Sequence, residues 1–278
     1  LESCPNKALT LDGSGISINR TICEGCGTCA EDCPSTALEL MGERWTLEDL
    51  VDEVIKDKAY FDSSEGGITI SGGEPALQYQ FSAAFLKAVK EKGIQTAFDT
   101  CGLCSEKSLE MILPHSTMVL FDLKLIDPEH HKKVTRASNS RILSNLKLVA
   151  DFMQSHVHPK SLWIRTPIIP GVTDSEENIS GIGEFIASNL QNKVERWELC
   201  AFNNLCKDKY TRLGQNWSFD DAELIKEQKM KALAETARKS GVNPDIVHWS
   251  GSTLAESNED EANEADSVPL KQTLNYQL

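Results

Sequence analysis

From about residue 66 onward, short apolar runs alternate with longer stretches whose apolar residues recur at helical spacing. The short runs are bounded by turn residues and predict strands, whereas the longer stretches predict helices. The predicted strands are 67–71, 94–100, 118–124, 162–168, 195–200 and 246–249. The predicted helices are 78–92, 105–113, 140–156, 174–190 and 220–240. Strands that alternate with helices indicate βαβ units, so we expect an α/β fold with a parallel sheet.

The segment 1–40 has a different pattern and predicts a small separate module. The motif Cys-Pro-x-x-Ala-Leu occurs at 4–9 and again at 33–38, which is an internal repeat. A capping box at 46–49 then opens an amphipathic helix. We expect domains at 1–40 and 41–251, followed by an acidic tail at 252–278 that lacks apolar periodicity and is predicted to be disordered.

Composition narrows the classes of function. The 278 residues include 40% hydrophobic residues, which is enough for a core, and 28 basic against 42 acidic residues give a net charge of −14. This charge argues against binding to nucleic acid or to anionic membranes. No apolar run approaches the length of a membrane span. Nine cysteines fit a reducing compartment, so we expect a cytoplasmic protein.

The motif C-x2-C-x2-C-x3-C-P predicts iron–sulfur clusters. This spacing is typical of bacterial ferredoxins, in which the last cysteine binds the other of two [4Fe–4S] clusters. The motif is formed by Cys23, Cys26, Cys29 and Cys33. Cys4, which also precedes a proline, can complete the cluster of the first three, so Cys33 points to a second cluster. The other ligands of that cluster would precede Leu1, and we therefore expect an N-terminally truncated chain. A zinc site, or four buried or disulfide-bonded cysteines, are the alternatives.

Polar residues follow several predicted strands, at the carboxyl ends where parallel sheets bind ligands. They are Gly72, Gly73, Glu74, Asp99, Thr100, Asp122, Lys124, Arg165 and Asn203. Glycines allow close approach of a backbone to a ligand, and paired carboxylates and cations suit a zwitterion such as an amino acid. The alternatives are an ordinary Gly-Gly turn with a surface glutamate and a strand-end ion pair between Asp122 and Lys124.

Taken in order, these motifs resemble the glycyl radical enzyme activating enzymes, a branch of the radical S-adenosylmethionine (SAM) superfamily. The resemblance rests on Ser-Gly-Gly-Glu-Pro at 71–75, Asp-Leu-Lys at 122–124, Ile-Pro-Gly at 169–171 and the upstream cysteine motif. It covers about residues 1–250 and implies a partial (β/α)6 barrel with a small α+β ferredoxin-like two-cluster module. The implied activity is reductive cleavage of SAM to a 5′-deoxyadenosyl radical, which abstracts hydrogen from a glycine of a partner glycyl radical enzyme.

The resemblance also implies cofactors, partners and residue roles. Gly72, Gly73 and Glu74 would hold the methionine amino group, and Asp122, Lys124 and Arg165 would help to hold SAM. Asp99, Thr100 and Asp122 match positions that can surround a monovalent cation. The implied electron donor is a flavodoxin or a ferredoxin.

Two departures from the family pattern stand out. No C-x3-C-x2-C motif for the catalytic cluster occurs in the 278 residues, so we expect it upstream of Leu1 and expect no activity from this chain alone. Asn203 stands where some members have a SAM-contacting histidine. Cys101 and Cys104 are interpreted as buried free thiols. The alternative functions are another radical SAM enzyme with auxiliary clusters and a two-cluster electron-transfer protein.

Overall fold

The computed structural model describes residues 1–13, 15–190 and 192–254, and the greater part of the predicted acidic tail lies outside these ranges. The chain divides into two compact units, Leu1–Leu50 and Val51–Leu278. No helix in the described part of the chain is long and apolar enough to cross a membrane.

The first unit is built from a hairpin and a single helical turn. Strands β1 (Leu9–Asp12) and β2 (Gly15–Ile18) pair antiparallel, and α1 (Thr28–Glu31) lies within the cysteine motif. Among the described residues of this unit, Ala8 is the one apolar side chain that is fully buried. Leu11 and Ile16, which face each other across the hairpin, are 63% and 41% exposed. The described part of this unit therefore has no apolar core of its own.

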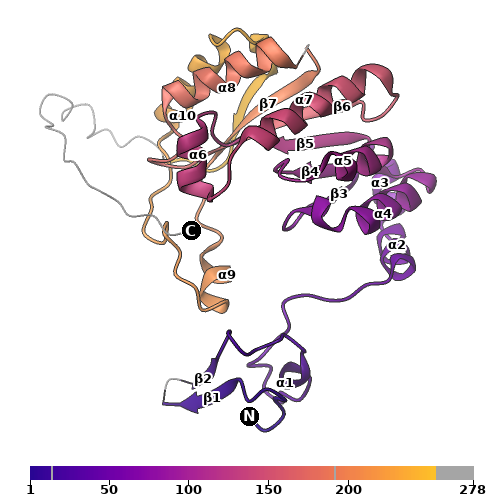
Figure 1. The fold of residues 1–278 in the computed structure, drawn as a ribbon, viewed down its shortest axis with the longest axis vertical. Coiled ribbons are helices and arrows are strands. Elements are labelled where there is room, and N and C mark those ends of the chain that lie inside the picture. The colour runs from indigo at the N-terminus through magenta and orange to yellow at the C-terminus, as the bar shows by residue number, and fades with distance from the viewer. Residues whose placement is uncertain (14, 191, 255–278) are drawn as a thin grey trace, which may run out of the picture. The chain divides into compact units, whose positions relative to one another are not determined.

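The second unit contains a parallel six-stranded sheet, which confirms the expected α/β class (Figure 1). The strands follow one another across the sheet in sequence order. They are β3 (Gly67–Ile70), β4 (Gln95–Thr100), β5 (Met118–Asp122), β6 (Ser161–Ile168), β7 (Val194–Ala201) and β8 (Val247–Ser250). The sheet is open, with β3 and β8 at its two edges.

Helices connect the strands, as the alternation of the sequence predicts. The helices that precede or connect the strands are α2 (Leu47–Ile55), α3 (Lys58–Ser64), α4 (Tyr79–Glu91), α5 (Glu106–Ile112), α6 (Pro128–Thr135), α7 (Ser140–Ser155), α8 (Glu176–Asn189), α9 (Lys207–Arg212) and α10 (Glu227–Arg238). The short 3₁₀ turns are η1 (Pro75–Gln78), η2 (Leu113–His115) and η3 (Pro244–Ile246). Each of the predicted helices corresponds to one of these elements.

The two faces of the sheet differ in polarity because successive residues of a strand point to opposite sides. Phe98, Phe121, Ile164 and Trp197 lie on one face and are fully buried. They form one apolar cluster with residues from α4, α5, α7, α8 and α10. The opposite face carries the partly exposed residues of the same strands, including Asp99, Asp122 and Arg165. This polar face positions the candidate site.

The structure corrects the predicted start of the last helix. The sequence predicts a helix over 220–240, but α10 begins at Glu227. The preceding residues hydrogen-bond elsewhere, because the Leu254 N–H donates to the Ile225 carbonyl and the Glu227 N–H donates to the Leu254 carbonyl.

Trp217 and Phe219 pack on Phe202 just after β7, with ring centroids 6.0 and 5.8 Å away.

Candidate functional site

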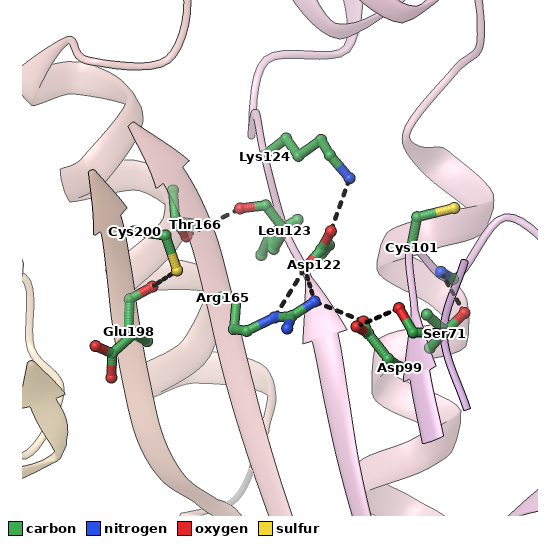
Figure 2. A network of polar contacts seen from close by, with 12 residues as sticks. Ser71, Asp99, Cys101, Asp122, Leu123, Lys124, Arg165, Thr166, Glu198 and Cys200 are labelled. Carbon is green, nitrogen blue, oxygen red and sulfur yellow. Dashed lines mark hydrogen bonds and ion pairs between the residues drawn. The ribbon is translucent and has the colours of Figure 1, made fainter. Parts of the chain in front are cut away.

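An arginine network joins three neighbouring strands at the carboxyl edge of the sheet (Figure 2). Arg165 of β6 donates from Nη2 to Asp99 Oδ1 of β4 at 2.5 Å and to Asp122 Oδ1 of β5 at 2.8 Å. Its Nε donates to the same Asp122 oxygen at 3.1 Å. Ser71, just after β3, donates to Asp99 Oδ2 at 3.0 Å. The parallel register, which places Asp122 opposite Arg165, brings these side chains together.

The network is partly screened from solvent. The side chains of Asp99, Asp122 and Arg165 are 14%, 25% and 28% exposed. Burial alone would lower the pKa of Arg165, but the charges and hydrogen bonds of Asp122 and Asp99 outweigh it, so the pKa is raised. Arg165 therefore stays charged, and no bond from its Nη1 to another described residue is observed. This nitrogen can donate to a ligand.

Lys124 extends the network beyond the end of the strand. The sequence places it on the strand 118–124, but β5 ends at Asp122 and Lys124 lies in the following loop. Its Nζ still donates to Asp122 Oδ2 at 3.1 Å, so the two side chains are adjacent as predicted. Asn178 of α8 fixes the loop by donating to the Lys124 carbonyl at 3.0 Å and accepting from the Ile126 N–H at 2.9 Å.

Glu74 is held by donors of the protein itself. Its Oε1 accepts from the Ala76 N–H at 3.1 Å and from the Thr100 hydroxyl at 2.8 Å. Its Oε2 accepts from the Cys101 N–H at 2.9 Å. A carboxylate can accept about four hydrogen bonds, so Glu74 has capacity for one further donor. Glu74 thus ties the loop after β3 to the end of β4.

The adjacent glycines leave room at this loop. Gly72 has φ of +118°, which favours glycine, and a Cβ placed at Gly72 or Gly73 would meet nothing within 4 Å. Thr100 is 2% exposed and its hydroxyl points to Glu74. The structure therefore joins Asp99 and Asp122 through Arg165 but directs Thr100 elsewhere.

Asn203 is not brought into the network. It is exposed, two residues beyond β7, and its Oδ1 accepts a hydrogen bond from the Leu205 N–H at 3.1 Å. Cys104 is buried and Cys101 is partly buried, and both thiols are free. Burial, followed by the negative charge of Glu74, raises the pKa of Cys104 to about 12. Cys104 is thus a buried free thiol, as the sequence predicts.

The sequence reasoning missed a charged row on the same face. Asp122, Arg165, Glu198 and His248 are partners in register across β5, β6, β7 and β8. Burial would raise the pKa of Glu198, but its hydrogen bond from Arg196 and the bond with Ser250 lower it overall. Alternation along 196–201, beyond a register shift at the start of β7, places Arg196 and Glu198 on the face of Arg165. That alternation was the signal that could have identified them.

The predicted cluster ligands lie in the first unit. The Ala8 N–H donates to Cys4 Sγ at 3.2 Å, and hydrogen bonding with Ser35 lowers the pKa of Cys33 to about 7. Gly25 and Gly27 have φ of +64° and +86°, so the loop that carries Cys26 turns tightly. Thiolates are the ligands of iron–sulfur clusters, so the donor set fits such a group.

The thiols themselves are not gathered. Within the described ranges, no group of three or more His, Cys, Asp or Glu side chains is arranged to hold a metal ion. The ligand set Cys4, Cys23, Cys26, Cys29 and Cys33 therefore stays a prediction.

Comparison with known proteins gives one family for this chain. Residues 24–180 match the model of the Radical SAM superfamily. The chain is 34% identical over 248 residues to the (2S)-3-sulfopropanediol dehydratase activating enzyme of Klebsiella oxytoca, covering 87% of this chain and 76% of the relative. It is 37% identical over 227 residues to the pyruvate formate-lyase-activating enzyme of Clostridium pasteurianum, covering 80% and 90%.

Solved structures agree on the fold. A domain of pyruvate-formate lyase-activating enzyme from Bacteroides vulgatus matches with a TM-score of 0.53 and 26% identity, over 67% of this chain and 99% of that one. Streptococcus suis SuiB bound to its precursor peptide matches with a TM-score of 0.55 over 77% of this chain and 44% of that one. Its identity of 18% supports the fold alone.

Proposed function

The chain belongs to the radical SAM superfamily and is a homologue of activating enzymes of glycyl radical enzymes. From this membership we propose that it binds SAM at the Arg165 network and that, in a protein that also carries the C-x3-C-x2-C motif, it activates a partner glycyl radical enzyme. The relatives' names cover different partner reactions, so the proposal specifies the class of partner and not its substrate. The observation that carries the proposal is the convergence of Asp99, Asp122 and Arg165 at the carboxyl edge of the parallel sheet.

The proposed roles follow from charge and remaining hydrogen-bond capacity. Arg165 Nη1 and the two unused N–H groups of Lys124 can bind the carboxylate of SAM. The open backbone at Gly72 and Gly73, with the remaining capacity of Glu74, can bind the amino group. The half-buried setting strengthens each of these contacts relative to open water.

The remaining cofactors belong to the same proposal. A bound, reduced [4Fe–4S] cluster would supply the single electron for cleavage of SAM to methionine and a 5′-deoxyadenosyl radical, and that radical would take a hydrogen atom from a glycine of the partner. No C-x3-C-x2-C motif occurs in the sequence, so the five cysteines of the first unit are assigned to auxiliary clusters. Asp99 and Asp122 offer oxygens to a monovalent cation. Asn203, just beyond β7, is proposed to contact SAM through its side-chain amide.

The electron donor and the setting complete the proposal. We assign a flavodoxin- or ferredoxin-type donor, because auxiliary clusters of this kind accept single electrons. The cysteine content favours a reducing cytoplasm.

One assay tests the activity. The full-length protein, reconstituted anaerobically with iron and sulfide, is reduced with SAM, with and without a candidate glycyl radical enzyme. We expect 5′-deoxyadenosine and a glycine-centred doublet in the electron paramagnetic resonance spectrum of the partner. Deoxyadenosine without the doublet from any glycyl radical enzyme tested would refute the activase role, and absence of both with intact clusters would favour electron transfer.

A second assay tests the site. We expect Glu74→Ala to weaken SAM binding and to leave the iron content unchanged. Glu129→Gln, which alters an exposed carboxylate at the start of α6, is the control. Equal SAM affinity in Glu74→Ala and the wild type would remove Glu74 from the site.

A further inference from the structure

A group of basic residues lies at the opposite end of the strands from the Arg165 network. Lys90 is at the end of α4, His115 is in η2, and His158 and Lys160 precede β6. These three segments lead into β4, β5 and β6, which are neighbours in the sheet. We call Lys90, His115, His158 and Lys160 the basic cluster.

Backbone hydrogen bonds hold the three segments side by side. The Thr117 N–H donates to the Thr96 carbonyl at 2.7 Å, and the Lys160 N–H donates to the Thr117 carbonyl at 2.8 Å. The Thr96 hydroxyl donates to the His115 carbonyl at 2.7 Å. Lys90 Nζ donates to the Pro114 carbonyl at 3.0 Å, which places its ammonium above the turn that carries His115. Backbone hydrogen bonds of the fold therefore bring together the segments that carry these basic residues.

Within the part of the chain that the structure describes, the basic cluster has no acidic partner, unlike several other basic residues. Within the described ranges, Lys56, Lys58, Lys207 and Arg238 each pair with a carboxylate at 3.0 Å or less. No described carboxylate lies within ion-pair distance of Lys90, His115, His158 or Lys160, and the nearby Lys87 reaches Glu91 only at 4.0 Å. Acidic residues outnumber basic ones by 42 to 28. A group of basic residues without an acidic partner is therefore unexpected from the composition.

The charges of Lys90 and Lys160 act on other members of the group. Burial and then the charge of Lys160 lower the pKa of Lys90. Burial, Lys90 and Lys160 lower the pKa of His158. Burial, Lys90 and Lys87 lower the pKa of His115, with Glu91 opposing them. Like charges crowded in this way are unfavourable in the absence of a counterion.

A second observation points to a missing partner. Nδ1 of His158 is buried and has no hydrogen-bond partner among the described residues. Buried polar atoms are nearly always hydrogen-bonded, so an unpaired ring nitrogen on a histidine whose pKa the charges of Lys90 and Lys160 lower calls for an explanation. An anion that accepts hydrogen bonds from the imidazole and the lysines would meet both needs.

We propose that the basic cluster binds an oxyanion of the phosphate class at the amino-terminal edge of β4, β5 and β6. The ammonium groups of Lys90 and Lys160 supply charge-assisted hydrogen bonds, and the two imidazoles supply further donors. The ligand is either free phosphate or the phosphoryl group of a nucleotide, because both present the same oxygens. This site is separate from the Arg165 network, so it stands or falls independently of the proposed activity.

Calorimetric titration of the full chain tests the proposal. Inorganic phosphate is titrated at an ionic strength matched with chloride, and ADP is titrated in parallel to distinguish the two sources. We expect saturable binding of phosphate, of ADP or of both, with one site per chain. Lys160→Ala, which changes an exposed residue and should fold normally, is expected to weaken binding by roughly tenfold, the equivalent of one charge-assisted hydrogen bond.

Matched controls make the result decisive. Lys133→Ala removes an exposed lysine of α6 and should bind phosphate as the wild type does. In proton spectra of the wild type, added phosphate should shift the ring resonances of His115 and His158 and leave that of the exposed His130 in place. Absence of saturable binding at millimolar phosphate and ADP, or equal affinity in Lys160→Ala and the wild type, would overturn the proposal.

Discussion

Arg165 determines the geometry of the site at the residue scale. It lies 66 residues from Asp99 and 43 from Asp122 in the sequence, yet it binds both. Each acid faces a guanidinium that cannot deprotonate near neutrality. The arginine therefore keeps two carboxylates close together that would otherwise repel each other.

Removing this arginine should destabilise the second unit. In Arg165→Ala, Asp99 and Asp122 would stay partly buried without their shared cation. We expect the free energy of unfolding to fall by about 1–3 kcal/mol. Urea denaturation followed by circular dichroism measures the change.

The accompanying variants isolate the cause. Asp99→Asn in the Arg165→Ala background should restore part of the loss, because it removes one unpaired charge. Lys133→Ala, an exposed cation with no such role, should change stability little. An Arg165→Ala loss no larger than that of Lys133→Ala would show that the ion pairs contribute nothing.

The lowered pKa of Glu198 predicts that the free energy of unfolding depends on pH. Its pKa in the folded state is lowered below the reference value of 4.5, so it contributes stability that is fully present above that value and is lost as pH falls through the folded pKa. Glu198→Gln should therefore reduce the loss of stability between pH 6 and roughly pH 3. Urea midpoints at several pH values test this. Parallel pH profiles for the variant and the wild type would contradict it.

At the element scale, the turn after β4 depends on one glycine. Gly102 has φ of +71°, and a Cβ there would lie 2.1 Å from Cζ of the buried Phe121. Asn145 of α7 fixes the same turn by donating to the carbonyls of Gly102 and Cys104 at 2.7 and 3.0 Å. The turn leads from Thr100 and Cys101, which hold Glu74, into α5.

A matched pair of glycine substitutions separates strain from collision. Gly171 has the same φ of +71° but nothing within 4 Å of a built Cβ. We expect Gly171→Ala to cost about 1–2 kcal/mol from backbone strain alone. Gly102→Ala should cost about 1–3 kcal/mol more because of the collision with Phe121. Thermal unfolding measures both, and equal losses would mean that Phe121 moves aside freely.

The elements that sequence patterns missed are short or polar. Helix α6 (Pro128–Thr135) has one buried residue, His131, so it lacks the apolar period that identifies a helix. The sequence nevertheless holds a signal for the start of α6, because Asp127 caps the helix and Pro128 occupies its first turn. The start of α10 was wrong for another reason, because Leu254 takes up the backbone groups of Ile225 and Glu227. No local pattern reveals such a distant partner.

At the scale of the whole molecule, the two units differ in what can stabilise them. Val51–Leu278 encloses a large apolar cluster, whereas Leu1–Leu50 buries Ala8 alone among its described apolar residues. Small domains without a core usually depend on metals or disulfides. We infer that metal binding to the cysteines supplies most of the order of the first unit.

Hydrogen exchange tests this inference. With iron and sulfide removed by a chelator, amides of residues 1–50 should exchange rapidly, whereas β4, β5 and β6 stay protected. Reconstitution should protect residues 1–50. Cys26→Ala should lower iron and sulfide per chain and abolish that protection.

Cys206→Ala serves as the control, because Cys206 is exposed like Cys26 but lies outside the cysteine motif. Its iron content and exchange should match the wild type. Equal protection of residues 1–50 with and without iron would refute the dependence on metal.

The sequence by itself determined the six strands in their order, five of the helices that connect them, the parallel sheet and the residues at the carboxyl ends of the strands. These follow from local periodicity, because burial of one face imposes a repeat on neighbouring positions. The ordered motifs also determined the family. Asp122 and Lys124 are two positions apart in the sequence, so their contact was predictable from that spacing, although Lys124 lies in the loop after β5 and not on the strand.

Only the tertiary structure decided which groups are bound to which. It gave Arg165 to Asp99 and Asp122, tied Glu74 to Thr100, and brought Lys90 to the turn that carries His115. These partners come from separate strands and connections, and their meeting depends on the register of the sheet. Register is set by the packing of the whole unit, so it leaves no trace in the spacing of a single segment.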